Sequence, residues 1–220
     1  MDQYSYKNDT DILKVNVDDI FPVHHSIQYK SGEIIFKQAT PSTQLIWIKS
    51  GIVKIYKEGI KERTFIVRLY AEGDYIELAD LFGNGFHSNT AVTVTPVTIG
   101  FIDHMEFRKL LFEDNDLSYM MFSHLNKEIL FLKDQLVTRS VKQLPGRIAD
   151  VLLYFYNINN ESLTFDFPLT RVELAHLISS TKESVIRTLG EFKHDKIIDI
   201  EGRKIKINSL EIVKTLSLYG

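Results

Sequence analysis

The sequence contains no cysteine among its 220 residues. This absence excludes disulfides, zinc sites with thiolate ligands, cysteine-held iron–sulfur clusters and cysteine nucleophiles. The first residues, MDQYSYKNDTD, are polar and acidic, whereas a secretory signal begins with basic residues and continues with apolar ones. No run reaches the roughly 18 apolar residues of a membrane span. We therefore expect a cytoplasmic protein that does not enter a membrane.

An overall excess of basic charge is also missing. The formal net charge is −3, although residues 140–220 carry 11 Lys and Arg against 10 Asp and Glu. Any contact with nucleic acid must therefore come from a local basic patch rather than from the charge of the whole chain.

Signatures of catalysis are absent as well. There is no P-loop, no dinucleotide fingerprint and no Ser-His-Asp signature. A metal-dependent jelly-roll enzyme would need a His-x-His pair, but His24 and His25 are adjacent and would point to opposite faces of a strand. We assign no catalytic residue and no metal ligand, and we predict that the protein is not an enzyme.

Short alternating runs rich in β-formers fill the stretch from Ile27 to about Ile102, with glycines between or beside them. This pattern predicts an antiparallel sandwich or jelly roll rather than βαβ units. A helical pattern replaces it after residue 105, so we predict an α+β chain. We expect a β-roll over 1–110, a long helix over 111–141 and a third unit over 142–220.

The run from Met105 to Val141 contains neither glycine nor proline. A short helix to about Phe112 is expected first, with EDNDLS as a break before a long amphipathic helix. A long helix with a near-heptad stripe usually packs against a neighbouring domain or a second copy of itself, and we expect self-association. The stripe consists of Met121, Leu125, Ile129, Leu132 and Leu136.

The remaining residues predict a winged helix-turn-helix. Pro145 suits the first turn of one helix, and Thr170 with Glu173 forms a capping box at the start of the next. A turn at Ser179 leads to a second helix that begins near Thr181. The runs KIIDIEG and RKIKINS then predict a β-hairpin.

The second of these helices carries charged residues in its first two turns, the part that enters the major groove in a helix-turn-helix. We predict that Lys182, Glu183 and Arg187 contact bases, since Arg grips guanine and a carboxylate accepts from cytosine N4. The alternative is an ordinary surface helix. On such a helix Glu183 would close a capping box that begins at Ser180 and would form a surface ion pair with Arg187. The candidate phosphate contacts are Thr170, Arg171, Ser180, Arg203 and Lys204.

The segment LTRVELAHLISSTKESVIRTLGEFKHDKIIDIEGRKIKI resembles the signature of the Crp/Fnr family of bacterial transcription regulators, with its Glu-Ser/Thr-Val-x-Arg core at Glu183–Arg187. Upstream, LIWIKSGIVKIY and LYAEGDYIELADLF resemble the cyclic-nucleotide-binding β-roll. One departure is Ser179, where the family often has glycine, and we expect only a mild backbone adjustment there.

The resemblance implies a homodimer joined by the long helix, bound to double-stranded DNA at a palindromic operator with TGA-like half-sites. It also implies contact with RNA polymerase if the protein is an activator. Lys182 stands where the cAMP-responsive branch has Arg, and Ile186 where the oxygen-sensing branch has Ser, so the half-site is expected to differ from both.

The resemblance places an effector pocket in the β-roll. The family's Gly-Glu and Arg-Ser pairs correspond here to Glu77–Leu78 and His87–Ser88, and the helix positions that meet the purine are Leu132 and Lys133. A mostly neutral His is a poor substitute for the Arg that holds a cyclic phosphate. We therefore do not expect cAMP to bind.

Three alternatives for the β-roll stay open: an unidentified small-molecule effector, a filled scaffold without a ligand, and haem on an axial histidine, which is not favoured. The available histidines are His24, His25, His87, His104 and His124. The alternative for the whole chain is a haem- or small-molecule-binding sensor, or a protein-interaction module, without sequence-specific DNA binding.

Overall fold

The amino-terminal half is an antiparallel β-roll of two four-stranded sheets. A computed structural model describes residues 25–58 and 64–220, which leaves His24 outside the described residues. The first sheet has the order β1-β8-β3-β6 and the second β2-β7-β4-β5, with every pair antiparallel. The strands are β1 (His25–Tyr29), β2 (Ile34–Phe36), β3 (Gln44–Ser50), β4 (Val53–Glu58), β5 (Thr64–Tyr70), β6 (Tyr75–Ile76), β7 (Thr90–Thr93) and β8 (Val97–Asp103). The predicted α+β class and β-roll are confirmed.

A glycine allows the largest aromatic side chain of the β-roll to lie flat on its own sheet. Trp47 of β3 pairs with Gly100 of β8, and both are buried. A Cβ atom at position 100 would lie 2.2 Å from Cε2 of the indole. A larger residue at position 100 would therefore displace Trp47 from the core.

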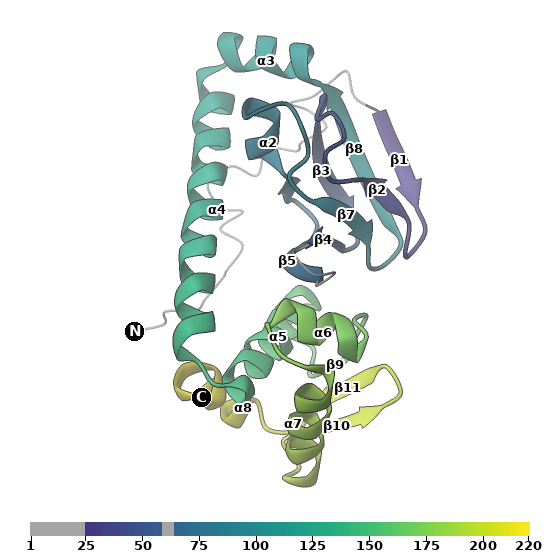
Figure 1. Cartoon of the computed structure of the whole chain (residues 1–220), viewed down its shortest axis with the longest axis vertical. Helices are drawn as coiled ribbons and strands as arrows, with labels where there is room; N and C mark the ends of the chain where they lie inside the picture. Colours follow the sequence, from purple (N-terminus) through teal and green to yellow (C-terminus); the bar gives the residue numbers. More distant parts are fainter. Residues whose placement is uncertain (1–24, 59–63) are drawn as a thin grey trace.

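One helix interrupts the strands of the β-roll, and two further helices follow the β-roll along the chain. They are α2 (Leu78–Phe82), α3 (His104–Glu113) and α4 (Asn115–Val141). Asp103 caps α3, and Asp114 caps α4 by accepting from the backbone N–H groups of Asp116 and Leu117. The predicted break between a short helix and a long one is therefore confirmed. Figure 1 shows α4 running along one side of the β-roll down to the carboxy-terminal unit.

The predicted stripe on α4 mixes two faces of the helix. Met121 is only 3% exposed and belongs to the core that α4 forms with the β-roll, and Leu125 packs against the same core. Ile129, Leu132 and Leu136 are 50%, 45% and 68% exposed. Of the two partners that we considered for the stripe, the β-roll is therefore the one against which Met121 and Leu125 pack, and the role of the stripe in a dimer stays a prediction. The outward face of α4 instead carries the following exposed apolar side chains: Tyr119, Phe122, Ile129, Leu130, Leu132, Leu136, Val137 and Val141.

The carboxy-terminal unit is a winged helix-turn-helix with an additional last helix. Its elements are α5 (Leu144–Ile158), β9 (Thr164–Asp166), α6 (Arg171–Leu177), α7 (Lys182–His194), β10 (Ile198–Glu201), β11 (Lys204–Ile207) and α8 (Leu210–Tyr219). The three strands form one sheet in the order β10-β11-β9, and the hairpin between β10 and β11 is the predicted one. We did not predict α8, which packs closely on α5. A Cβ atom at position 146 would collide with the carbonyl group of Gly220, so the contact requires a glycine there.

The β-roll and the carboxy-terminal unit share a hydrophobic core. Ile66 and Leu69 of β5 are buried in the same cluster as residues of α5, α6 and α7, and α6 packs against β5. Figure 1 shows α5 and α6 directly below β4 and β5. The division of the chain at 110/111 and 141/142 stays a prediction.

Candidate nucleic-acid interface and sensor pocket

Two capped helices and a tight turn build the reading unit. The Thr170 hydroxyl accepts from the N–H of Glu173, and the Glu173 carboxylate accepts from the N–H of Thr170 at 2.7 Å. This is the predicted capping box. On α7 the cap is Thr181, whose hydroxyl accepts from the N–H of Ser184 at 3.2 Å. The alternative in which Ser180 caps this helix is therefore wrong.

The turn between α6 and α7 keeps a left-handed residue. Ser179 has φ +54°, a conformation that favours glycine because a Cβ atom crowds the following carbonyl. Arg147 of α5 donates to the carbonyl of Ile178 at 2.7 Å, which ties the turn to the rest of the unit. The mild backbone adjustment that we expected at Ser179 stays a prediction, but the residue does adopt a left-handed conformation that is strained for a serine.

The three predicted base-contacting residues lie together on the exposed side of α7. Lys182, Glu183 and Arg187 are all exposed, whereas Val185 and Leu189 are buried behind them in the core of the unit. Ile186 is 48% exposed on the same open side. The buried face therefore fixes the helix and leaves the charged side chains facing outward.

Arg187 is not paired with Glu183. Its Nε lies 3.9 Å from Oε1 of Glu191, one turn further along α7, and both side chains are more than half exposed. Such a pair contributes little and is easily replaced by a ligand. Within residues 25–58 and 64–220, the Glu183 side chain has no hydrogen bond or ion pair. The surface ion pair between Glu183 and Arg187 that we considered as an alternative is thus wrong.

The predicted phosphate contacts form two groups at the ends of the unit. Arg203 and Lys204 are exposed at the tip of the hairpin, where Gly202 adopts φ +60° to close a tight turn. Thr170 is exposed at the amino terminus of α6. Arg171 is half-buried with its guanidinium 5.9 Å from the centre of the Phe167 ring.

Ser180 lies in the segment between α6 and α7. It is half-buried in the turn, where its backbone N–H donates to the carbonyl of Ala175 at 2.9 Å.

An acidic group occupies the predicted phosphate end of the sensor pocket. The N–H and hydroxyl of Ser88 donate to the two carboxylate oxygens of Asp80 at 2.7 and 2.6 Å. The amide of Asn89 donates to Glu77 at 2.8 Å. The pKa of the Glu77 carboxyl is raised to about 8, mainly by burial and secondly by a hydrogen bond with Asp80. These residues do not fit a cyclic phosphate, because the donors of Ser88 are already used by a carboxylate that would repel it.

The side chain of His87 is buried inside the β-roll and does not face a position where it could contact an anion. It is 6% exposed, and its ring stacks on Phe36 with 3.7 Å between centroids. Burial lowers the pKa of this imidazole, so it is neutral at pH 7 and offers no charge to an anion. The other predicted pocket residues do not join it: Leu78 is buried in the core below α2, and Leu132 and Lys133 are exposed on α4.

A polar network between the β-roll and α4 was not predicted. Arg68 of β5 forms an ion pair with Glu128 of α4, and its guanidinium lies 4.2 Å from the centre of the Phe131 ring. Tyr70 donates to the same carboxylate at 3.2 Å. Burial raises the pKa of Glu128, although Arg68 opposes this effect. Arginine inside an alternating strand was the available signal for this contact.

Three of the described candidate histidines lie against aromatic rings of the protein. His124 packs edge-on against Tyr75, and burial lowers its pKa to about 4. His104 lies edge-on to Phe82, and His25 is exposed at the start of β1. His87 is in turn stacked on Phe36. Among the described residues no three His, Asp or Glu side chains gather as a metal site, and no helix is long and apolar enough to cross a membrane.

Two domain families match the chain. Residues 26–114 match the cyclic nucleotide-binding domain, and residues 146–215 match the Crp-like helix-turn-helix domain. Each match covers one of the two structural units that flank α4.

Curated relatives span most of the chain. The CRP-like cAMP-activated global transcriptional regulator of Mycobacterium tuberculosis is 24% identical over 189 residues, 84% of each chain. The global nitrogen regulator of Synechococcus elongatus is 25% identical over 187 residues, 82% of this chain and 84% of the other.

Solved structures share the fold. FixK2 from Bradyrhizobium japonicum superposes with a TM-score of 0.79 at 19% identity, covering 88% of this chain and 97% of its own. The c-di-GMP-responsive global regulator CLP of Xanthomonas campestris gives a TM-score of 0.73 at 18% identity, covering 87% and 97%.

Proposed function

Because the chain belongs to the Crp/Fnr family of transcription regulators, we propose that it binds a palindromic DNA operator as a homodimer and controls transcription from it. The observation that carries the proposal is the outward face of α7, where Lys182, Glu183 and Arg187 are exposed above a fully buried apolar side. Along the chain, α7 follows the capped helix α6 after a tight turn. This is the arrangement that places a recognition helix in the major groove.

The charges on α7 suit base edges better than phosphates. Within the described part of the chain, the one ion pair of Arg187 is its weak surface contact with Glu191, so its guanidinium is available for a bidentate grip on guanine O6 and N7. Glu183 would be repelled by phosphate, but its carboxylate can accept from the N4 amino group of cytosine. Lys182, at the first position of the helix, then reads the neighbouring base and sets the operator apart from those of the better-known branches.

Contacts with the DNA backbone would come from both ends of the unit. Arg203 and Lys204 at the hairpin tip supply charge, Arg171 supplies a guanidinium, and Thr170 and Ser180 supply hydroxyl groups. These contacts orient the unit on the duplex without reading sequence.

The outward face of α4 is the surface we assign to the dimer. Phe122, Ile129 and Leu136 recur at a spacing of seven residues and are 71%, 50% and 68% exposed in the single chain. This spacing keeps one seam against a parallel partner helix. Two copies related by a two-fold axis would present their α7 helices to successive major grooves, about 34 Å apart.

The β-roll is proposed to take no cyclic nucleotide. Asp80 already holds the donors of Ser88, and His87 is neutral and stacked on Phe36. A neutral small molecule or no effector at all is consistent with these contacts. If the protein activates transcription, RNA polymerase is its further partner, and its place of action is the cytoplasm, where the DNA is.

A binding-site selection from random duplexes tests the proposal. The purified protein is expected to enrich a palindrome whose half-sites are centred about 10 base pairs apart. The contrary result is that no sequence is enriched and that the affinity for every duplex falls steeply as the salt concentration rises. It would indicate a module that binds DNA through phosphates alone, and it would overturn the proposal.

A further inference from the structure

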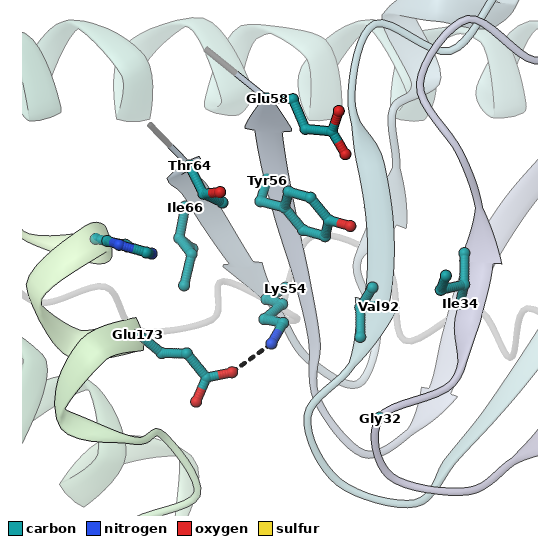
Figure 2. A pocket seen from close by; sticks show the side chains of 10 residues that line it. Gly32, Ile34, Lys54, Tyr56, Glu58, Thr64, Ile66, Val92 and Glu173 are labelled. Carbon is teal, nitrogen blue, oxygen red and sulfur yellow. Dashed lines mark hydrogen bonds and ion pairs between the residues drawn. The ribbon is translucent and has the colours of Figure 1, made fainter. Parts of the chain in front are cut away.

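An ion pair joins the β-roll directly to the reading unit. The Nζ of Lys54, on β4, contacts Oε1 of Glu173, in the first turn of α6, although the two residues are 119 positions apart. Figure 2 shows the two side chains reaching toward each other across the junction. Their side chains are only 18% and 23% exposed, so this pair is better shielded from solvent than an ordinary surface ion pair.

The same carboxylate caps the helix. While Oε1 of Glu173 contacts Lys54, Oε2 accepts from the N–H of Thr170 at 2.7 Å. Burial opposes the charge of Glu173, but the hydrogen bonds from Lys54 and Thr170 outweigh it and lower the pKa of the carboxyl. The carboxylate is therefore ionised at neutral pH, and one group fixes both the start of α6 and its contact with the β-roll.

The ion pair borders a groove of about 440 Å³ between the two units (Figure 2). The lining residues that carry charge or can titrate are Lys54, Tyr56, Glu58, Glu173 and His176. Ile66 forms an apolar part of the wall and continues into the core of the carboxy-terminal unit. The junction thus has a packed apolar part and one charged contact beside an open groove.

The covalent link between α4 and the reading unit is short and extended. Only Lys142 and Gln143 separate α4 from α5, and both have extended backbone, with ψ 138° and 169°. Lys142 also binds Asp150 of α5 at 2.7 Å. Beyond this link, the apolar packing of Ile66 and Leu69 and the ion pair of Lys54 both hold the reading unit against the β-roll, and the ion pair limits how far the unit can turn about the link.

We propose that Lys54 is a positioning residue for operator binding, which holds α6 on the β-roll through Glu173 and so sets the spacing of the two α7 helices. The inference rests on the proposed function. Lys182, Glu183 and Arg187 are exposed in the arrangement with the ion pair formed, and the proposal takes this arrangement as the one that binds DNA. Because α7 follows α6 through one tight turn, the position of α6 determines that of α7.

The test compares four variants on the selected operator and on a duplex without it. Lys54→Met removes the charge, and Glu173→Gln keeps an oxygen for the capping box but loses the ion pair. We expect each to weaken operator binding about 3- to 10-fold and to leave binding to the other duplex unchanged. The double variant should be no weaker than the weaker single one, since both changes remove the same contact. Lys54→Arg should retain wild-type affinity within about twofold.

Lys57→Met is the matched control. Lys57 lies on the same strand, is exposed and does not line the groove, and its replacement changes the net charge by the same amount. If Lys54→Met and Lys57→Met bind the operator equally well, the inference is overturned while the proposed function stands. Failure of the wild-type protein to bind any operator would overturn both.

A distance measurement gives a readout independent of DNA. The chain has no cysteine, and Gly190 is exposed on α7 with no atom near an added Cβ, so Gly190→Cys provides one clean site for a spin label. The distance between the two labels of a dimer should have a narrow distribution in the parent and in Lys57→Met, and a broad one in Lys54→Met. An equally narrow distribution in Lys54→Met would contradict the positioning role.

Discussion

Leu136 on the outward face of α4 gives the sharpest prediction about assembly. Its side chain is 68% exposed in the single chain. Full burial of a leucine stabilises by about 1.5–3 kcal/mol, so covering the exposed part contributes about 1–2 kcal/mol in each subunit. A two-fold interface counts this twice, and Leu136→Ala should therefore weaken the dimer by about 2–4 kcal/mol. The dissociation constant should rise about 30- to 700-fold, at about 1.4 kcal/mol for each factor of ten.

Sedimentation velocity over a series of concentrations measures this constant. Phe86→Ala is the control, since Phe86 is 49% exposed but lies in the β-roll before β7. Met121→Ala provides the contrast: Met121 is buried within its own chain, so its truncation should cost about 2–5 kcal/mol of folding stability and leave the association of folded subunits unchanged. A dimer unaffected by Leu136→Ala but weakened by Phe86→Ala would refute the assignment of the interface.

Three further predictions concern the turn, the sensor and the wing. Ser179→Gly should raise the free energy of unfolding by about 0.5–1 kcal/mol, because glycine adopts φ +54° without strain; urea titrations measure this, and no gain would contradict it. Since the pKa of Glu77 is raised to about 8, its stabilisation is complete below about pH 4.5 and is lost as the pH rises toward 8. Glu77→Gln should therefore flatten this decline and add about 1–3 kcal/mol at pH 8, and an unchanged pH profile would contradict the assignment. Lys204→Ala should reduce the slope of log affinity against log salt by about one without altering the selected sequence, whereas a changed sequence would mean that Lys204 reads bases.

Features with local signals were predictable from the sequence. The capping box of Thr170 and Glu173, the start of α7 near Thr181 and the break before α4 all depend on residues within a few positions of one another. The exposure of Arg187 followed because its neighbours Val185 and Leu189 define the buried face. The last helix, α8, had a usable signal in the spacing of Leu210, Val213 and Leu216, which we did not interpret.

Features that depend on tertiary contacts were not predictable. Periodicity identified α4 as amphipathic, but which arc the β-roll covers depends on the packing of Leu117 and Met121, so the sequence did not tell which members of the stripe would face the β-roll. The contact of Asp80 with Ser88 depends on how two loops approach each other. The pair of Lys54 and Glu173 is formed by residues 119 positions apart, for which the sequence carries no local pattern.

The central claim is that α7 reads base pairs through Arg187. The most direct test is to measure how tightly the Arg187→Ala variant binds operators whose sequence has been changed. Fluorescence anisotropy at several salt concentrations would compare wild type and Arg187→Ala on the selected operator and on one in which the G·C pair of each half-site is replaced. We predict that the wild-type protein loses about 1–3 kcal/mol per half-site on the altered operator, and that Arg187→Ala binds both operators equally weakly. If Arg187→Ala still distinguishes the two operators as the wild-type protein does, the account of recognition is wrong.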